Sequence, residues 1–515
     1  SSGYGSCSGW YPKGILMQSS NSKLYGVTQS GGDSDLGVLF EYDPITSAIL
    51  DKLSFDKSNG ALPEYGHLVE ITNTNYTWTG AIDSNWLNPL NWAGEDVPDT
   101  LDNVVIPVGR TNYPHLLDTA VCTNFTLKSN AYGDASFIEN KMLFAFGDIT
   151  IERYLSGFNS SSSGWHYLSS PMKDINIANS DFVPSTNVDD LYLWDESISE
   201  WSNYNGGSFE HDSFEEGLGY LVGYTITSTK HFVGELNSDS ITKNLGFTAG
   251  MGDGWNLLGN PYSSAIKWDS LIKTETMDGS FYIVDPINGT YLVSNSSGGD
   301  LPNGEIPINQ AFLVKANSEL DSLIFTTNAQ TNSNNNFNKS NTGRKETLII
   351  KLDGQNSSNN TYLQFNENAT MAYDRKIDAY KLFGYANIAQ VYTEMDDIQY
   401  AINNLAYSNE SISVPLNIQL FHDEELTLNI TGIDSFDSQV GIDLEDLKTG
   451  TITNIRKNAI YTFQATTADD ANRFILHFNG VTAVGDIEET QSHNPLIYTF
   501  NNTIYIQTKE LKNAD

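Results

Sequence analysis

Short apolar runs recur along the whole chain, separated by turns rich in Asn, Gly, Ser and Asp. They follow one another roughly every 8 to 15 residues, and several alternate apolar with polar positions. Amphipathic patterns of helical period are almost absent. Clear examples of the runs are residues 37–43, 348–353 and 473–478. Regularly spaced short strands of this kind predict an all-β protein made of serial β-sandwich-type domains.

An internal repeat occupies the middle of the chain. Three segments recur in the same order with offsets of 90, 90 and 92 residues: 164–171 and 254–261, 191–195 and 281–285, 219–222 and 311–314. Matches at one nearly constant period predict two homologous β domains, which we place at 156–250 and 251–328. In each domain a tryptophan, Trp165 or Trp255, follows a glycine and precedes an apolar strand. We expect both rings to lie in the hydrophobic cores at matching positions.

Polar residues separate the repeat from the C-terminal part of the chain. Residues 329–344 are rich in Asn and Ser with almost no apolar content, which predicts a mobile linker. The segment 345–480 is predicted to be a further β-sandwich. In 481–515, a polar and acidic stretch precedes two apolar runs around Asn501 and Asn502, the pattern of a β-hairpin. This hairpin either belongs to a separate, truncated domain or adds an edge to the preceding sandwich.

Composition narrows the classes of partner. Asp and Glu outnumber Lys and Arg by 64 to 27, for a formal charge of −37. Such a surface repels phosphate backbones and anionic lipid, which argues against nucleic-acid binding. No apolar run approaches the ~20 residues of a membrane helix, so we expect no membrane insertion. The two cysteines, Cys7 and Cys122, lack metal-site spacing, and whether they form a disulfide is left open.

Catalytic motifs are missing from the sequence. It contains no G-x-S-x-G, H-E-x-x-H, C-x-x-C or phosphate-binding glycine loop, so we predict that the chain is not an enzyme. His166 and His477 are interpreted as strand residues. Carboxylate pairs of a glycosidase remain an alternative, because their ~5–9 Å separation is invisible in sequence.

Two weaker patterns suggest ligands. Asp33 and Asp35 place two carboxylates in one Gly-rich turn, which makes calcium the candidate cofactor. Trp194 and Trp201 flank an acidic turn and are candidates for stacking on the sugar rings of a surface glycan. The alternative interpretation is that both rings are core or edge residues of the repeat.

Several segments carry motifs in a characteristic order. They are Leu24 to Thr28 with Gly37 to Pro44; Trp78, Trp86, Trp92 and Val104 to Pro107; the paired repeat; and Leu444 to Gly450, Tyr461 to Phe463 and Arg473 to Phe478. In this order they resemble segments of large multidomain cargo proteins of the Bacteroidetes type IX secretion system. The resemblance implies a partial propeller-like repeat unit at 1–73 and a Trp-motif β-rich segment at 74–155. It also implies a tether and the first strands of a truncated type A C-terminal sorting domain at 481–515.

The resemblance also implies a location and partners. The chain is expected at the cell surface or outside the cell, after export across the outer membrane. The type IX translocon and its outer-membrane shuttle protein would bind the C-terminal segment, through residues alternating along its strands: Leu496, Tyr498, Phe500, Ile504 and Ile506. The expected function is that of a non-catalytic adhesin or structural stalk. The alternative is a set of carbohydrate-binding modules attached to an upstream polysaccharide-active enzyme.

Overall fold

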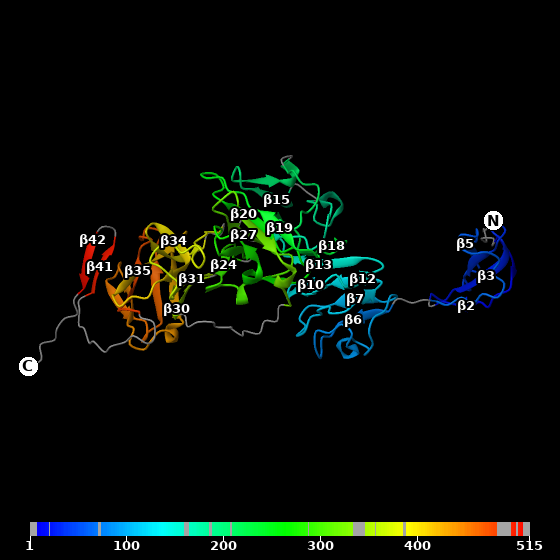
Figure 1. The fold of residues 1–515 in the computed structure, drawn as a ribbon, viewed down its shortest axis with the longest axis horizontal. Coiled ribbons are helices and arrows are strands. Elements are labelled where there is room, and N and C mark those ends of the chain that lie inside the picture. Colours follow the sequence, from blue (N-terminus) through cyan, green and yellow to red (C-terminus); the bar gives the residue numbers. More distant parts are fainter. Residues whose placement is uncertain are drawn as a thin grey trace, which may run out of the picture. The chain divides into compact units, whose positions relative to one another are not determined.

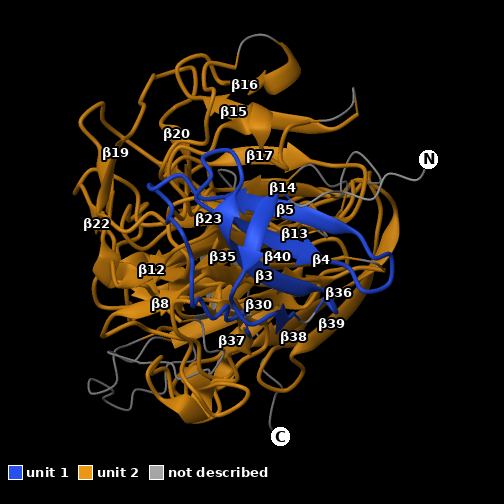
Figure 2. Ribbon diagram, turned by 90° about the vertical axis from the view of Figure 1, so that its right-hand side faces the viewer, with its two compact units in different colours: residues 1–74 blue, residues 75–515 orange. Residues whose placement is uncertain are grey.

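The computed structural model shows an all-β protein, as the sequence predicts. It describes residues 8–19, 21–70, 74–158, 164–184, 188–206, 209–286, 288–332, 346–355, 357–384, 388–481, 496–500 and 503–507. Figures 1 and 2 show strands throughout, and the chain divides into two compact units, residues 1–74 and 75–515. The predicted boundary after residue 73 lies one residue from this division.

Unit 1 is a small antiparallel sheet. Its strands are β1 (Gly9–Pro12), β2 (Met17–Gln18), β3 (Leu24–Gly31), β4 (Val38–Tyr42) and β5 (Ile49–Ser54), in the order β1-β3-β4-β5 with β2 beside β3. Among its described residues, only Val27 and Val38 are fully buried hydrophobic side chains, whereas Trp10 is 66% exposed. Of its described residues, Glu41 is the buried carboxylate, and Lys23 and Lys52 neutralise it. Unit 1 therefore has very little core of its own.

Unit 2 begins with a solenoid-like stack of parallel strands. Four strands form a parallel row: β6 (Asn75–Thr77) pairs with β7 (Asn103–Ile106), β7 with β9 (Asn124–Leu127), and β9 with β13 (Ile149–Leu155). On a second side β8 (Ala120–Cys122) pairs in parallel with β12 (Leu143–Ala145), and a single parallel bridge joins His115 to Ile138. Both of these pairings join residues 23 apart. A parallel sheet of this kind requires a full turn of chain between strands, and each turn buries its apolar side chains against the next.

The tryptophans of the motif at 74–107 close one end of this stack. Trp78, Trp86 and Trp92 are at most 2% exposed, and Trp92 packs edge-to-face on the other two at centroid distances of 5.0 and 4.7 Å. Two of the three indole N–H groups donate to backbone carbonyls, that of Trp78 to Asn112 and that of Trp92 to Trp86, whereas the buried indole nitrogen of Trp86 has no hydrogen-bond partner. The 3-10 helix η1 (Pro89–Asn91) carries Asn91, whose side chain holds the loop 82–85. The smaller β10 (Ser129–Asn130) and β11 (Gly133–Asp134) form a hairpin at the side.

The two repeats have the same topology. Repeat 1 contains a sheet in the order β14-β17-β15-β16, and repeat 2 a sheet in the order β20-β27-β23-β24-β25. The bounds are β14 (Trp165–Leu168), β15 (Asp190–Asp195), β16 (Glu200–Asn203) and β17 (Tyr220–Gly223); β20 (Trp255–Gly259), β23 (Phe281–Val284), β24 (Tyr291–Asn295), β25 (Gly298–Gly299) and β27 (Ala311–Lys315). The internal repeat deduced from sequence is therefore confirmed in strand order.

Registers match as well as strand order. In repeat 1, Tyr192 lies opposite Leu221 on one side and Asn203 on the other. In repeat 2, Tyr282 lies opposite Leu313 and Val293. These partners are offset by 90, 92 and 90 residues, so the repeat extends to individual residue pairs.

A second strand pair closes each repeat. The last strand of repeat 1, β18 (Ser228–Val233), pairs with β13, and its counterpart β28 (Ser322–Phe325) pairs with β19 (Ile241–Asn244). Each repeat thus starts with a strand that lies before its Gly-Trp motif. The remaining short elements of this region are η2 (Ile177–Asn179), η3 (Tyr204–Gly206), β21 (Ala265–Lys267), η4 (Trp268–Ser270), β22 (Ile272–Lys273), η5 (Pro302–Gly304), β26 (Glu305–Ile306), η6 (Thr327–Ala329) and β29 (Gln330–Thr331).

Hydrophobic cores lie on both faces of each repeat sheet. One face of the repeat 1 sheet packs with the solenoid, through residues such as Leu168 and Val222. The matching face of repeat 2 packs on its own second layer, through Phe281 and Phe312. The other faces of both sheets meet in a shared core that also takes in side chains of the C-terminal sheet. We call it the junction core; its buried members are Tyr167, Leu221, Leu257, Tyr282, Val284, Val293, Ala311, Leu313, Tyr362, Ala379, Ala401 and Ile402.

This junction corrects the prediction for Trp165 and Trp255. Neither ring is fully buried; both are half-buried and pack at the margin of the junction core. The fully buried residues of the repeated motif come two and three positions later, at Tyr167 and Leu168 in repeat 1 and at Leu257 and Leu258 in repeat 2. Each tryptophan is the first residue of its strand, β14 or β20, and lies at the margin of the junction core, where it is only partly covered.

The C-terminal part is one continuous sheet. Eleven strands follow the order β38-β37-β40-β35-β33-β34-β31-β30-β36-β39, with β32 also paired to β34. They are β30 (Glu346–Asp353), β31 (Ser358–Phe365), β32 (Ala379–Tyr380), β33 (Gln390–Met395), β34 (Ile398–Leu405), β35 (Ile412–Gln419), β36 (Glu424–Thr431), β37 (Ile442–Asp446), β38 (Thr451–Asn454), β39 (Ile460–Ala465) and β40 (Phe474–Phe478), with the 3-10 helix η7 (Ile433–Ser435). Side chains from nearly all of them fill a single core. One curled sheet therefore encloses this core, in place of the two separate sheets expected at 345–480.

Two predictions concern segments that are only partly described. The linker expected at 329–344 starts later: β29 pairs with β21, and Asn332 bonds to Ser136 and to the carbonyl of Tyr113, whereas 333–345 lie outside the described residues. The predicted C-terminal hairpin is confirmed: β41 (Leu496–Phe500) and β42 (Thr503–Gln507) form a two-stranded antiparallel sheet. In the described part of the chain, no helix has the length and hydrophobicity needed to span a bilayer.

Candidate functional sites

Hydrogen bonds from backbone N–H groups stabilise the acidic turn that contains Asp33 and Asp35. Asp35 has a positive φ of 56° and its carboxylate accepts the backbone N–H of Gly31 at 2.9 Å. Asp33 donates its own N–H to Ser54. Throughout the described residues, no group of three or more His, Cys, Asp or Glu side chains is arranged to hold a metal ion. Two exposed carboxylates in one turn are a thin ligand set for Ca²⁺, which takes six to eight oxygens.

Trp194 and Trp201 lie directly opposite each other on β15 and β16. Their ring centroids are 5.2 Å apart, both rings are half-buried, and Trp194 donates its indole N–H to the carbonyl of Trp255 at 2.6 Å. Further rings continue the row across the same sheet face: Tyr192 lies 6.5 Å from Trp201 and 6.0 Å from Trp165. The sequence singled out two members of a longer aromatic surface at the margin of the junction core.

The residues expected to form a sorting signal all lie on the C-terminal hairpin. In the pairing of β41 with β42, Tyr498 is opposite Tyr505 and Leu496 is opposite Gln507. Leu496, Tyr498 and Phe500 alternate along β41, and Ile504 and Ile506 alternate along β42. The hairpin forms a sheet of its own and does not join the sheet order of β30 to β40.

The remaining titratable residues of the sequence analysis have structural positions. Cys122 is a free thiol, completely buried in β8, and burial raises its pKa to about 12; Cys7 lies outside the described residues. His166 lies in β14, where burial lowers its pKa to about 4. His477 lies in β40 and is held between Ser413 and Glu445.

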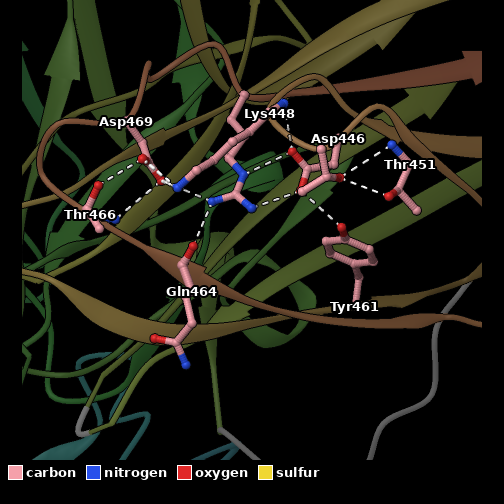
Figure 3. A network of polar contacts seen from close by, with 9 residues as sticks. Asp446, Lys448, Thr451, Tyr461, Gln464, Thr466 and Asp469 are labelled. Atoms are coloured by element: carbon pink, nitrogen blue, oxygen red, sulfur yellow. Dashed lines mark hydrogen bonds and ion pairs between the residues drawn. The ribbon is translucent and has the colours of Figure 1, made fainter.

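The motif residues of 444–478 converge on one buried polar network, shown in Figure 3. Arg473 binds both carboxylate oxygens of Asp446, at 3.0 and 2.8 Å, and reaches Asp469 at 3.0 Å. Tyr461 donates its hydroxyl to Asp446, and Lys448 contacts both oxygens of Asp469. The side chains of Arg473 and Asp446 are 6% and 0% exposed.

Several donors satisfy both carboxylates of this network. Burial alone would raise the pKa of Asp469, but hydrogen bonds from Lys448 and Thr466 outweigh it and lower the pKa to about 2. Burial likewise opposes ionisation of Asp446, and Arg473 and Tyr461 overcome it, so its pKa is also lowered. The guanidinium of Arg473 lies over the ring of Phe463, 4.5 Å from its centroid. The network ties together β37, β39 and the start of β40, so these motif residues hold the sheet and offer no open chemistry.

A second polar region joins repeat 2 to the C-terminal sheet, and the sequence analysis did not predict it. Asn295 donates to the carbonyl of Ile377 at 2.6 Å, and Ser280 donates to that of Asp378 at 2.8 Å. The backbones approach so closely that a Cβ on Gly279 would lie 2.1 Å from the carbonyl oxygen of Lys376. The only possible signals were glycines, whose partners lie about 100 residues away in the chain.

Comparisons with known proteins give a family without an assigned role. The model of a domain of unknown function, DUF8693, matches residues 132–285 and 281–478. No curated protein and no solved structure matches the chain. The matched residues cover both repeats and the curled C-terminal sheet, which is more than half of the sequence. The chain therefore belongs to the DUF8693 family.

Proposed function

We propose that this chain is a non-catalytic protein of the cell surface or extracellular space, exported by type IX secretion, that acts as an adhesin or structural stalk. It would consist of serial β parts that carry load between an anchor and a distal binding surface. The observation that carries the proposal is the junction core, in which repeat 1, repeat 2 and the C-terminal sheet bury apolar side chains against one another. Parts that share a core resist separation better than domains joined by linkers.

A pulling experiment on the full chain tests the load-bearing role. In the wild type we expect the two repeats and the C-terminal sheet to unfold in one coupled event. Tyr282→Ala, which empties the centre of the junction core, should split this event into separate ones. Leu428→Ala is the matched control, because it damages only the core of the C-terminal sheet. Independent unfolding events in the wild-type chain would contradict the proposal.

Export is tested separately. We propose that the hairpin of β41 and β42 begins a sorting domain that the type IX translocon and the outer-membrane shuttle protein recognise. Its pairing as an isolated two-stranded sheet supports this, since such a hairpin is marginal in water without further strands or a partner. The complete C-terminal region of the precursor from Val481 onward, fused to a periplasmic reporter in a type IX-competent cell, should bring the reporter to the surface. Retention in the periplasm, while a known sorting domain is exported, would refute the assignment.

A second candidate function is glycan binding, as a module set attached to a polysaccharide-active enzyme or as the adhesive surface itself. The half-buried aromatic row of Trp165, Tyr192 and Trp201 favours it, because ring faces can cover the apolar side of a sugar. A glycan array probed with the full chain should show reproducible signals that Trp201→Ala removes. Tyr132→Ala is the control, since this ring is 96% exposed on a separate turn. Signals that survive Trp201→Ala, or an entirely silent array, would exclude this surface.

A further inference from the structure

Among the described residues, Lys381 is the most deeply buried lysine, and its amine forms no salt bridge there. Its side chain lies between the C-terminal sheet and repeat 2, and the residue is 8% exposed. Burial lowers its pKa to about 7, so a large share of the amine is uncharged at neutral pH. An uncharged primary amine in a dry site is a nucleophile.

The group in contact with this amine is a side-chain amide. The Nζ atom of Lys381 lies 2.6 Å from Oδ1 of Asn359, on β31. The same oxygen accepts the backbone N–H of Val391 at 3.1 Å. Asn359 is 7% exposed, so its carboxamide is fixed in place and shielded from water. A backbone donor on the carbonyl oxygen stabilises the negative charge that builds up there when a nucleophile adds to the carbon.

A carboxyl group, that of Asp300, lines a small cavity that Lys381 also lines. The cavity is bounded by Tyr282, Tyr291, Asp300, Asn360, Lys381 and Leu382. Asp300 comes from repeat 2 and accepts hydrogen bonds from the backbone of Val293, from Asn360 and from Tyr362. Burial raises the pKa of Asp300, and the hydrogen bonds that it accepts oppose this rise.

From this arrangement we propose that Lys381 and Asn359 become joined by an intramolecular isopeptide bond. The lone pair of Nζ adds to Cγ of Asn359, and the N–H of Val391 holds the oxygen. One proton passes from Nζ to Nδ2 within the tetrahedral adduct, and the carboxyl group of Asp300 beside Lys381 favours the positive charge that develops on Nζ during the addition. The Cγ–Nδ2 bond then breaks, the Nζ–Cγ amide remains, and ammonia leaves. One amide replaces another, so no oxidant, metal or second substrate takes part.

The bond would lock the segment that docks on repeat 2. The chain between the two residues contains the loop whose backbone at Lys376 and Ile377 contacts Gly279 and Asn295. Since Asp300 belongs to repeat 2, the reaction would be completed only after repeat 2 and the C-terminal sheet have come together. The inference concerns chemistry inside the chain and does not depend on the proposed function.

Intact-mass spectrometry of the full chain is the first measurement. We expect a mass about 17 Da below the sequence mass, the loss of one ammonia, in protein aged at neutral pH. Tandem spectra of a digest should show one branched peptide that links Lys381 to Asn359. Lys381→Met and Asn359→Ala should each restore the full mass expected for the variant, and Asp300→Asn should slow the loss by at least tenfold.

Controls separate this bond from other losses of ammonia. Lys273→Met is the matched lysine control, because Lys273 is partly buried with a pKa lowered to about 8, but its amine bonds to backbone carbonyls and lies over the ring of Trp268. This variant should keep the mass loss. A loss that persists in Lys381→Met would indicate cyclisation of an asparagine and overturn the proposal. A mass equal to the sequence mass after prolonged incubation of folded protein would also overturn it.

Discussion

Replacement of Arg473 by methionine is the sharpest test of the buried network in Figure 3. Methionine keeps only an unbranched apolar stem: it removes the guanidinium, its contact with the ring of Phe463 and three hydrogen bonds to Asp446 and Asp469. Asp446 then remains in the interior with its residue only 1% exposed. Removal of one partner of a buried pair is costly because the other charge is left unpaired.

The magnitude follows from what each carboxylate keeps. Loss of one partner from a buried ion pair costs about 3–5 kcal/mol. Asp446 retains the hydroxyl of Tyr461 and the N–H of Lys448, and Asp469 retains the amine of Lys448. We therefore expect the lower end, about 3 kcal/mol, for Arg473→Met. Lys448→Met removes an exposed partner of Asp469 and should cost less than about 1 kcal/mol.

Urea unfolding at pH 7, followed by hydrogen exchange of β37 and β40, measures both variants. The pH dependence gives a second check. The pKa values of Asp446 and Asp469 are lowered by folding, so their stabilisation is complete above pH 4 and is lost as the pH falls toward about 2. Arg473→Met should flatten this acid limb. Equal costs for Arg473→Met and Lys448→Met would show that the network is no more than a surface feature and would refute the reasoning.

Three further predictions address other parts of unit 2. His166 has a pKa of about 4 in the folded state, below that of a free histidine, so the unfolded state binds a proton at higher pH than the folded state does. The free energy of unfolding should therefore fall by up to about 3 kcal/mol as the pH drops from 6.5 to 4. His166→Gln should remove this pH dependence in urea titrations. Trp78→Ala should destabilise the solenoid by about 3–5 kcal/mol, seen as faster hydrogen exchange in β6 and β7, and unchanged exchange would disprove its capping role. Gly279→Ala should cost about 1–3 kcal/mol by forcing a Cβ against Lys376. Gly206→Ala controls for the glycine change, because Gly206 also lacks a positive φ and its Cβ would make only an ordinary contact; equal costs would locate the effect in the backbone alone.

Local patterns in the sequence predict the strands well, but not how distant strands associate. The repeat could be predicted because matching motifs, such as those at Trp165 and Trp255, occur within one chain. In the structure the strands that carry them have the same pairing register. The solenoid was missed because its parallel pairs, such as Ala120 with Leu143, join short strands whose only shared signal is an irregular spacing of 21 to 28 residues. Burial of the tryptophans was overestimated because the junction core depends on contacts with Tyr362, far along the chain.

The contacts of the candidate sites could not be predicted for the same reason: they depend on how distant strands associate. Asn359 and Lys381 are ordinary surface residues by type, and nothing in the sequence tells that both become buried or that Lys381 comes to line one cavity with Asp300 of repeat 2. Trp194 and Trp201 were found because residues of unusual size stand out in any local window. Their cross-strand pairing was not foreseen, since it depends on the register of β15 with β16.

The closing strand of each repeat bears on how such a protein can be lengthened or shortened during evolution. Because β18 pairs with β13, and β28 with β19, a gene segment that begins at the Gly-Trp motif would encode a unit without its own first strand. A duplication that starts at about residue 149 and ends near 238 would carry both strands and could be inserted without leaving an unpaired edge. The natural unit of exchange is therefore shifted toward the N-terminus relative to the most recognisable motif, and the breakpoints between related proteins should be sought ahead of Trp165 and Trp255.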